Sequence, residues 1–379
     1  MSAALVRCGS LAEVVATDWD ALAGSAQPFL SHAFLSSLED SGSVGGDSGW
    51  LPAHRLWRDD SGRLVAAMPA YVKQHSFGEY VFDMAWAEAC QRAGIGYYPK
   101  LLGGVPFSPV QGPRLLGDAR ACAALLDALP RQALGEGLSG IHVNFTDGPS
   151  DALLQGREGW LERLGCQFHW FDRGYRDFQD FLDALSSRKR KQMRKEREQV
   201  AGLGIDFERR RGDQLSELEW DFVYACYANT YRVRGRLPYL TREFFSLLAE
   251  RMPQALQLVF ARRAGQPVAM TFSLLDEDCL YGRYWGCLGE FDRLHFETCF
   301  YQGIEQALEL GLRRFDAGAQ GEHKLLRGFE PVLTRSWHWL AHPGLRAAVA
   351  DFLAAEGAGV RAYAEQAREA LPYRRNEGA

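Results

Sequence analysis

The pattern of apolar and polar positions repeats once along the chain. Apolar residues at helical spacing follow Pro28 and again follow Pro238, and Ser31 or Thr241 can cap the start of each predicted helix. After each helix, two apolar runs separated by turn residues predict a hairpin. Each half then predicts a third strand, a long helix ending near a glycine, and two more strands. We therefore interpret the chain as two copies of one mixed unit.

The predicted elements follow the same order in both halves. In the first half they are strands at 54–57, 64–71 and 80–86, a helix at 119–134, and strands at 141–145 and 168–170. In the second half they are strands at 256–261, 267–275 and 280–285, a helix at 297–310, and strands at 314–317 and 337–339. The first half is longer before its long helix, which predicts an insertion at 87–118.

The length of the chain agrees with this division. A single hydrophobic core rarely grows beyond about 250–300 residues, and this chain has 379. We predict an α+β protein with an N-terminal domain at 1–174, which carries the insertion, and a C-terminal domain at 175–379, which carries a basic helix and a helical tail.

The composition excludes several classes of protein. Hydrophobic residues make up 47% and charged residues 24% of the chain, which is typical of a globular protein and not of a disordered or fibrous one. The net charge of -5 disfavours DNA as a partner. The eight cysteines form no C-x-x-C pair, so we expect no metal site. Neither a membrane-spanning run nor a signal peptide is evident, and we expect a cytoplasmic protein.

The densest cluster of reactive side chains follows the strand predicted at 314–317. His323 could accept a proton near neutral pH, and Glu322 could do so if burial raised its pKa. Lys324 or Arg327 could bind a carboxylate or a phosphate. The alternative is a solvated polar loop with glycine turns. The polar members of the cluster are Asp316, Gln320, Glu322, His323, Lys324 and Arg327.

A strongly basic run occupies residues 188–197 of this acidic chain. It carries seven basic residues, and we expect it on a helix that begins after Asp180. Such a helix could bind a phosphate-rich partner, namely a tRNA, a nucleotide-linked acceptor or an anionic lipid. It could equally be a solvated helix face. The residues predicted to bind phosphate are Arg190, Lys191, Arg194 and Lys195.

Four stretches carry a resemblance to a known family. They are P-F-S-P-V-Q-G-P-R at 106–114, Y-G-R-Y-W-G at 281–286, H-F-E-T at 295–298 and F-D-A-G-A-Q-G-E-H-K at 315–324. The chain resembles the FemAB-like acyltransferases of the GNAT superfamily, in a group labelled peptidoglycan biosynthesis or recognition. The resemblance covers nearly the whole chain and implies two tandem GNAT-like domains.

The resemblance also implies a reaction. It suggests an N-acyltransferase that moves an acyl or aminoacyl group to an amine acceptor, such as a cell-wall precursor or a related metabolite. The donor would be acyl-CoA or aminoacyl-tRNA, with no tightly bound cofactor. Acetyl-CoA enzymes of this superfamily hold pyrophosphate with an R/Q-x-x-G-x-G/A loop, and residues 289–296 lack those glycines. A non-catalytic module that recognises a peptidoglycan precursor or an anionic ligand is the alternative.

The resemblance places the strand at 280–285 beside the acyl donor. Arg283 would then contact the donor, Tyr284 or Tyr281 could protonate the leaving group, and His295 could interact with an anion near the following helix. The predicted catalytic residues are Tyr284, Asp316, Glu322 and His323. The predicted substrate-binding residues are Arg283, His295, Gln320, Lys324 and Arg327.

Overall fold

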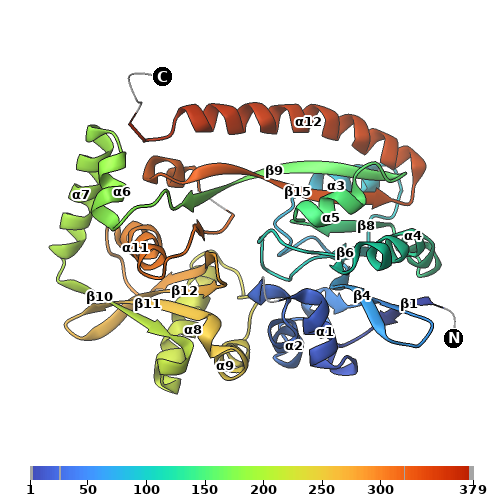
Figure 1. Cartoon of the computed structure of the whole chain (residues 1–379), viewed down its shortest axis with the longest axis horizontal. Coiled ribbons are helices and arrows are strands. Elements are labelled where there is room, and N and C mark those ends of the chain that lie inside the picture. The colour runs from blue at the N-terminus through green and yellow to red at the C-terminus, as the bar shows by residue number, and fades with distance from the viewer. Residues whose placement is uncertain (1–2, 25–26, 320, 375–379) are drawn as a thin grey trace. The chain divides into compact units, whose positions relative to one another are not determined.

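The chain folds into two compact units that are not contiguous in sequence. The computed structural model describes residues 3–24, 27–319 and 321–374 (Figure 1). The first unit comprises residues 1–165 and 333–362, and the second comprises residues 166–332 and 363–379. The sequence predicted a division after residue 174, which did not anticipate that residues 333–362 lie with the first unit. Two strands and the last helix cross the boundary: β9 (Trp160–Phe171), β15 (Glu330–Leu340) and α12 (Pro343–Glu369).

The first unit contains two sheets. The order of the smaller sheet is β1-β3-β4-β7, and the larger one runs from the C-terminal part of β15 through β8, β6 and β5 to β2. Only the β6–β8 pair is parallel among the pairs of this unit that the structure describes. The strands are β1 (Ala4–Cys8), β2 (Trp50–Pro52), β3 (His54–Arg58), β4 (Leu64–Met68), β5 (Ala70–Lys73), β6 (Lys100–Gly103), β7 (Leu116–Gly117) and β8 (Gly140–Asn144).

Helices α1 and α4 pack on the strands of the first unit. The long helix α4 contributes Leu125, Leu126 and Leu129 to a core that also contains the apolar side chains of β8. Ser31 caps α2 by accepting a hydrogen bond from the Phe34 amide, as predicted. The helices are α1 (Ala16–Ala23), α2 (His32–Asp40), α3 (Met84–Arg92), α4 (Ala119–Gly135) and α5 (Gly148–Leu154).

The predictions for the first unit need two corrections. Residues 80–86 are not a strand, because α3 begins at Met84. Trp86 and Cys90 of this helix, four residues apart, are buried in one hydrophobic cluster. The third strand is β6, which lies within the predicted insertion. The strand predicted at 64–71 is two strands, because Pro69 lacks the amide that would continue the ladder. β4 accordingly ends in the smaller sheet and β5 begins in the larger one.

The second unit has one sheet of order β10-β11-β12-β13-β14, followed by the C-terminal part of β9. α8 packs on one face of β12 and β13, and α11 packs on the other face (Figure 1). Thr241 caps α9 as predicted. The strands are β10 (Ile205–Arg211), β11 (Leu256–Arg263), β12 (Gln266–Leu275), β13 (Cys279–Cys287) and β14 (Arg314–Asp316). The helices are α6 (Phe178–Ala184), α7 (Ser187–Ala201), α8 (Glu217–Arg232), α9 (Arg242–Arg251), α10 (Leu294–Phe296) and α11 (Gln302–Glu309), with a π-helical turn at Glu297–Tyr301 and a 3-10 helix at Glu322–Arg327.

The closing strand of each half pairs outside its own half of the sequence. Trp170 of β9 lies opposite Phe315 of β14 in the second unit. Trp337 of β15 lies opposite Val143 of β8 in the first unit. The repeat predicted both strands at the correct place along the chain, but periodicity alone does not show which ladder a strand joins. No helix among the described residues is long and apolar enough to cross a bilayer.

Candidate functional site

The second unit contains a cavity of about 310 Å³ beside the end of β14. β13 and β14 pair in parallel only from Cys279 to Tyr281, after which β14 ends and β13 continues to Cys287. The backbone from Gly282 onward therefore extends past its parallel partner and forms one wall. The π-helical turn and α11 form the opposite wall, and the 3-10 helix at 322–327 supplies the remaining polar side chains.

An irregularity in β13 explains why consecutive residues reach the cavity. The register between β12 and β13 shifts at Phe272 and Ser273, so that Phe272 lies opposite Tyr284 and Ser273 opposite Gly282. Arg283 is the extra residue of this bulge. Because strict alternation is interrupted, both Arg283 and Tyr284 line the cavity.

The Tyr284 ring is held by other aromatic rings. Its centroid lies 4.9 Å from that of Tyr227 on α8 and 5.9 Å from that of Phe272 on β12. This packing fixes the ring while the residue lines the cavity. The phenol is therefore in a position from which it could donate a proton inside the cavity.

Gly286 gives α8 close access to β13. A Cβ atom at this position would lie 2.2 Å from the carbonyl oxygen of Cys226 in α8. Glycine at this position thus allows a helix of the protein itself to approach the strand. It brings Tyr227 against Tyr284.

Gly286→Ala is expected to lower the free energy of unfolding by about 1–3 kcal/mol, because the added methyl group must displace helix backbone. Gly359→Ala is the matched control: nothing lies within 4 Å of its added Cβ, and alanine is favoured over glycine in a helix. Urea denaturation of both variants measures the effect. Equal stability of Gly286→Ala and the wild type would contradict the close contact.

Lys324 is a buried cation in the wall of the cavity. Its side chain is buried, and its ammonium donates a hydrogen bond to the Gly318 carbonyl. Burial lowers the pKa of Lys324, the charge of Asp316 opposes this shift and Arg283 adds to it, and the pKa that results is about 8. Lys324 therefore keeps its charge at neutral pH and loses it under mildly alkaline conditions.

Asp316 lies behind the cavity and does not line it. Its carboxylate accepts a hydrogen bond of 2.9 Å from the Gly318 amide and lies 3.6 Å from Nε2 of His169. Burial alone would raise the pKa of Asp316, but His169 and Arg283 hold it below its ordinary value. Asp316 thus supplies negative charge beside Arg283 and Lys324 and orders the turn that Lys324 contacts.

His323 presents an available nitrogen. Its Nε2 atom is buried and has no hydrogen-bond partner among the described residues. The ring packs against Phe296 and Phe300, with centroids 5.5 and 5.4 Å away. Burial and the nearby Arg327 lower the pKa of His323 below its ordinary value, so the ring is neutral at pH 7. His295 also lines the cavity, and burial lowers its pKa to about 4.

Two of the predicted site residues lie elsewhere in the second unit. Glu322 is exposed and accepts a hydrogen bond of 2.8 Å from the Tyr363 hydroxyl. Arg327 is buried, where it stacks over Phe296 and binds Glu196 at 2.9 Å. Neither lines the cavity. Gln320 lies outside the described residues.

The basic run forms the helix α7, as predicted. Glu196 faces inward and binds Arg327, which fixes the helix to the segment that carries His323. Lys191, Arg194 and Lys195 are exposed, whereas Arg190 is partly exposed and forms an ion pair of 2.7 Å with Asp183. The helix therefore presents an exposed cationic face, and its predicted role in phosphate binding stays a prediction.

Sequence reasoning missed several polar groups of the cavity. Thr271 and Ser273 occupy alternate positions of β12, a spacing that signals a polar stripe on an otherwise apolar strand. Gln306 of α11 donates a hydrogen bond of 3.0 Å to Gln257 of β11. The other cavity residues outside the prediction include Arg234, Thr298 and Cys299. Within the described residues, no group of three His, Cys, Asp or Glu side chains could hold a metal ion.

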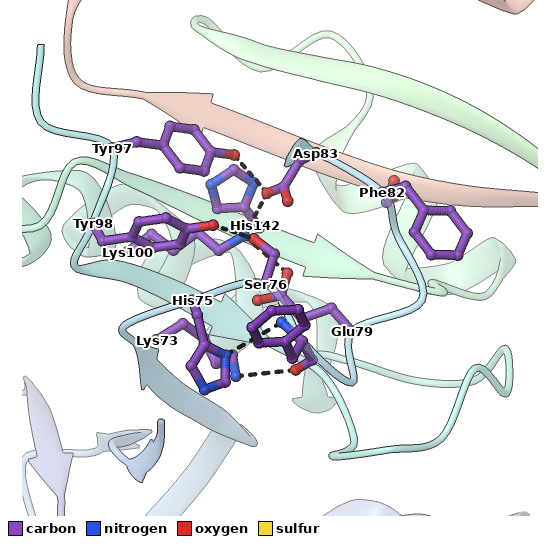
Figure 2. A network of polar contacts seen from close by, with 12 residues as sticks. Lys73, His75, Ser76, Glu79, Phe82, Asp83, Tyr97, Tyr98, Lys100 and His142 are labelled. Atoms are coloured by element: carbon purple, nitrogen blue, oxygen red, sulfur yellow. Dashed lines mark hydrogen bonds and ion pairs between the residues drawn. The ribbon is translucent and has the colours of Figure 1, made fainter. Parts of the chain in front are cut away.

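A second polar cluster lies in the first unit, where side chains of residues 74–99 meet Lys73, Lys100 and His142 (Figure 2). The ammonium of Lys100 binds Glu79 at 2.8 Å and also contacts Asp83, and all three side chains are buried. The Tyr97 hydroxyl donates a hydrogen bond to Asp83. Burial lowers the pKa of Lys73 to about 7. These contacts fasten the segment before β6 to the sheet.

Comparison with known proteins identifies the family. Residues 10–375 match the model of the FemAB-like family, which is described as peptidoglycan biosynthesis/recognition. The chain belongs to the FemAB-like family, which confirms the resemblance seen in the motifs. No curated protein matches the sequence.

Solved structures share the fold at low sequence identity. One is the C-terminal domain of a putative lysylphosphatidylglycerol synthetase from Agrobacterium fabrum, with 12% identity, a TM-score of 0.54 and coverage of 91% of this chain and 97% of that one. FemX has 11% identity and a TM-score of 0.54, and the match covers 89% of this chain and 98% of that one. L-PGS from Bacillus licheniformis has 11% identity and a TM-score of 0.51, and the match covers 88% of this chain and 98% of that one. The chain therefore shares the α+β fold of FemX and of these two synthetase structures.

Proposed function

We propose that the chain is an N-acyltransferase whose transfer step occurs in the cavity of the second unit. The observation that carries the proposal is the convergence of five predicted residues on one cavity: Arg283, Tyr284, His295, His323 and Lys324. An available neutral imidazole next to two cations suits attack of an amine on an acyl carbonyl. The family supplies the context of peptidoglycan biosynthesis or recognition.

The proposed step is nucleophilic substitution at the acyl carbon of the donor. The amine nitrogen of the acceptor forms the new C–N bond, and the C–S bond of a thioester or the C–O bond of an aminoacyl ester breaks. His323 accepts the proton that the amine loses. Tyr284 donates a proton to the departing sulfur or oxygen. Lys324 and Arg283 stabilise the negative charge that develops on the carbonyl oxygen or bind the phosphates of the donor.

Two donor classes fit this chemistry. The GNAT-like fold is compatible with acyl-CoA, whereas the missing glycine pattern at 289–296 and the exposed cations of α7 favour aminoacyl-tRNA. The proposed acceptor is an amine-bearing cell-wall precursor. A binding module without catalysis is the second candidate, because the pyrophosphate loop is absent from the sequence.

A transfer assay with the purified chain tests the proposal. Labelled acetyl-CoA and a mixture of labelled aminoacyl-tRNAs are supplied separately, each with a preparation of cell-wall precursors, and the label in amide products is counted. We expect one donor to yield amide product. If precursors bind but neither donor yields product, the binding module replaces the enzyme.

A further inference from the structure

A short loop at the edge of the cavity carries both arginines and exposed aliphatic side chains. We call residues 232–237, which follow α8, the cationic loop. Leu237 is 86% exposed and Val233 is 72% exposed. Arg232, Arg234 and Arg236 alternate with them and are also exposed. Single exposed apolar residues are normal, but this alternation of aliphatic and cationic side chains is not typical of a solvated turn.

The cationic loop is ordered by its backbone. The amides of Arg234 and Arg236 donate hydrogen bonds of 2.9 and 3.0 Å to the Tyr231 carbonyl, and the Gly235 amide donates one of 2.9 Å to the Arg232 carbonyl. Gly235 adopts a φ of 66°, which the turn requires and glycine permits. The exposed side chains are therefore carried by a built turn, and the Arg234 guanidinium donates a hydrogen bond of 3.0 Å to the Thr230 carbonyl.

The arginines of the cationic loop have no acidic partner. In the part of the chain that the structure describes, none of the three forms an ion pair, although the chain as a whole is acidic. The second unit has carboxylates available, and Arg242 nearby in sequence binds both Glu217 and Asp221. Three guanidinium groups without an acidic partner therefore form a site of positive charge that an anionic partner would neutralise.

We propose that the cationic loop docks the protein on an anionic membrane surface. Arginines bind lipid phosphates, and Val233 and Leu237 enter the boundary between headgroups and acyl chains. Aliphatic side chains cannot stack on bases, so the loop fits a bilayer better than a nucleic acid. A second copy of the chain would present the same positive charge and would be repelled.

Docking would also orient the cavity. Arg234 belongs both to the cationic loop and to the lining of the cavity, so a membrane bound at the loop lies at the edge of the site.

Sedimentation of the full chain with lipid vesicles tests the docking. Vesicles of 30% phosphatidylglycerol in phosphatidylcholine are compared with pure phosphatidylcholine. We expect binding only to the anionic vesicles, and weaker binding at high salt. Val233→Ser with Leu237→Ser should weaken binding at least about tenfold. Arg232→Gln with Arg236→Gln should weaken it about 25-fold, since each cation near an anionic surface contributes about fivefold, or 1 kcal/mol.

Two matched variants serve as controls. Leu218→Ser removes an aliphatic side chain that is 80% exposed on α8, and Arg120→Gln with Arg131→Gln removes two exposed cations from α4. Both should bind vesicles like the wild type. The inference is overturned if the wild type does not bind, if the control variants lose as much binding as the loop variants, or if the loop variants lose tRNA binding instead. Vesicle binding is measured without an acyl donor, so the result of the docking test does not depend on the result of the transfer assay.

Discussion

Lys100→Met is expected to lower the free energy of unfolding by about 3–5 kcal/mol, which is the largest loss of stability that the structure implies. Lys100 is fully buried between Glu79 and Asp83. Its removal leaves two carboxylates in a buried site without the cation that binds both of them (Figure 2). Methionine preserves most of the side-chain volume, so the loss of stability is due to the missing charge and not to a cavity.

Chemical denaturation with two comparison variants isolates that effect. Lys191→Met removes an exposed lysine from α7 and should change stability by less than about 0.5 kcal/mol. Adding Glu79→Gln and Asp83→Asn to Lys100→Met should restore part of the stability, because neutral side chains no longer require a cation. If the triple variant were no more stable than Lys100→Met, the cost would not be electrostatic.

His323→Ala is expected to lower kcat by about 10²–10⁴-fold, the range typical of lost general-base catalysis. The imidazole packs among aromatic rings, and its Nε2 atom has no partner among the described residues. Lys324→Met distinguishes the two roles proposed for its ammonium: loss of phosphate binding raises KM for the donor, and loss of oxyanion stabilisation lowers kcat. Transfer rates at varied donor concentration separate the two effects. His342→Asn, an exposed histidine of the first unit, is the control and should keep full activity.

The dependence of the transfer rate on pH provides a second test of the roles of His323 and Lys324. His323 must be neutral to accept a proton, so the rate should fall below its pKa, which lies under the usual 6.5. Lys324 must be charged to bind, so the rate should also fall as pH rises through its pKa of about 8. A bell-shaped dependence of kcat/KM is therefore expected, and Lys324→Arg should extend its alkaline side. A profile that stays level from pH 5 to pH 10 would contradict both roles.

Local signals in the sequence predicted much of the second unit. The Thr241 cap, the hairpin of β11 and β12, the strand β13 and the polar segment after β14 all follow from spacing within a few residues. Arg283 and Lys324 line one cavity because β13 and β14 are adjacent and parallel. The family resemblance implied a donor beside Arg283 but not this pairing.

The remaining features depend on contacts between distant parts of the chain. β6 begins with a charged residue, Lys100, whose ammonium is buried. The buried carboxylates of Glu79 and Asp83 compensate its charge, and both lie outside the strand. The pairing of Trp170 with the second unit and of Trp337 with the first requires two long-range ladders that periodicity does not specify. The bulge at Arg283 is likewise set by register against β12.

A structure of the chain bound to a donor analogue tests the central claim most directly. A thioether analogue of acetyl-CoA and a stable amide analogue of the aminoacyl end of tRNA are the two probes. The account predicts that the acyl group of at least one probe lies in the cavity, within hydrogen-bond distance of Arg283 or Lys324 and next to His323. A probe bound with its acyl group outside this cavity, with the cavity closed to it, would contradict the account.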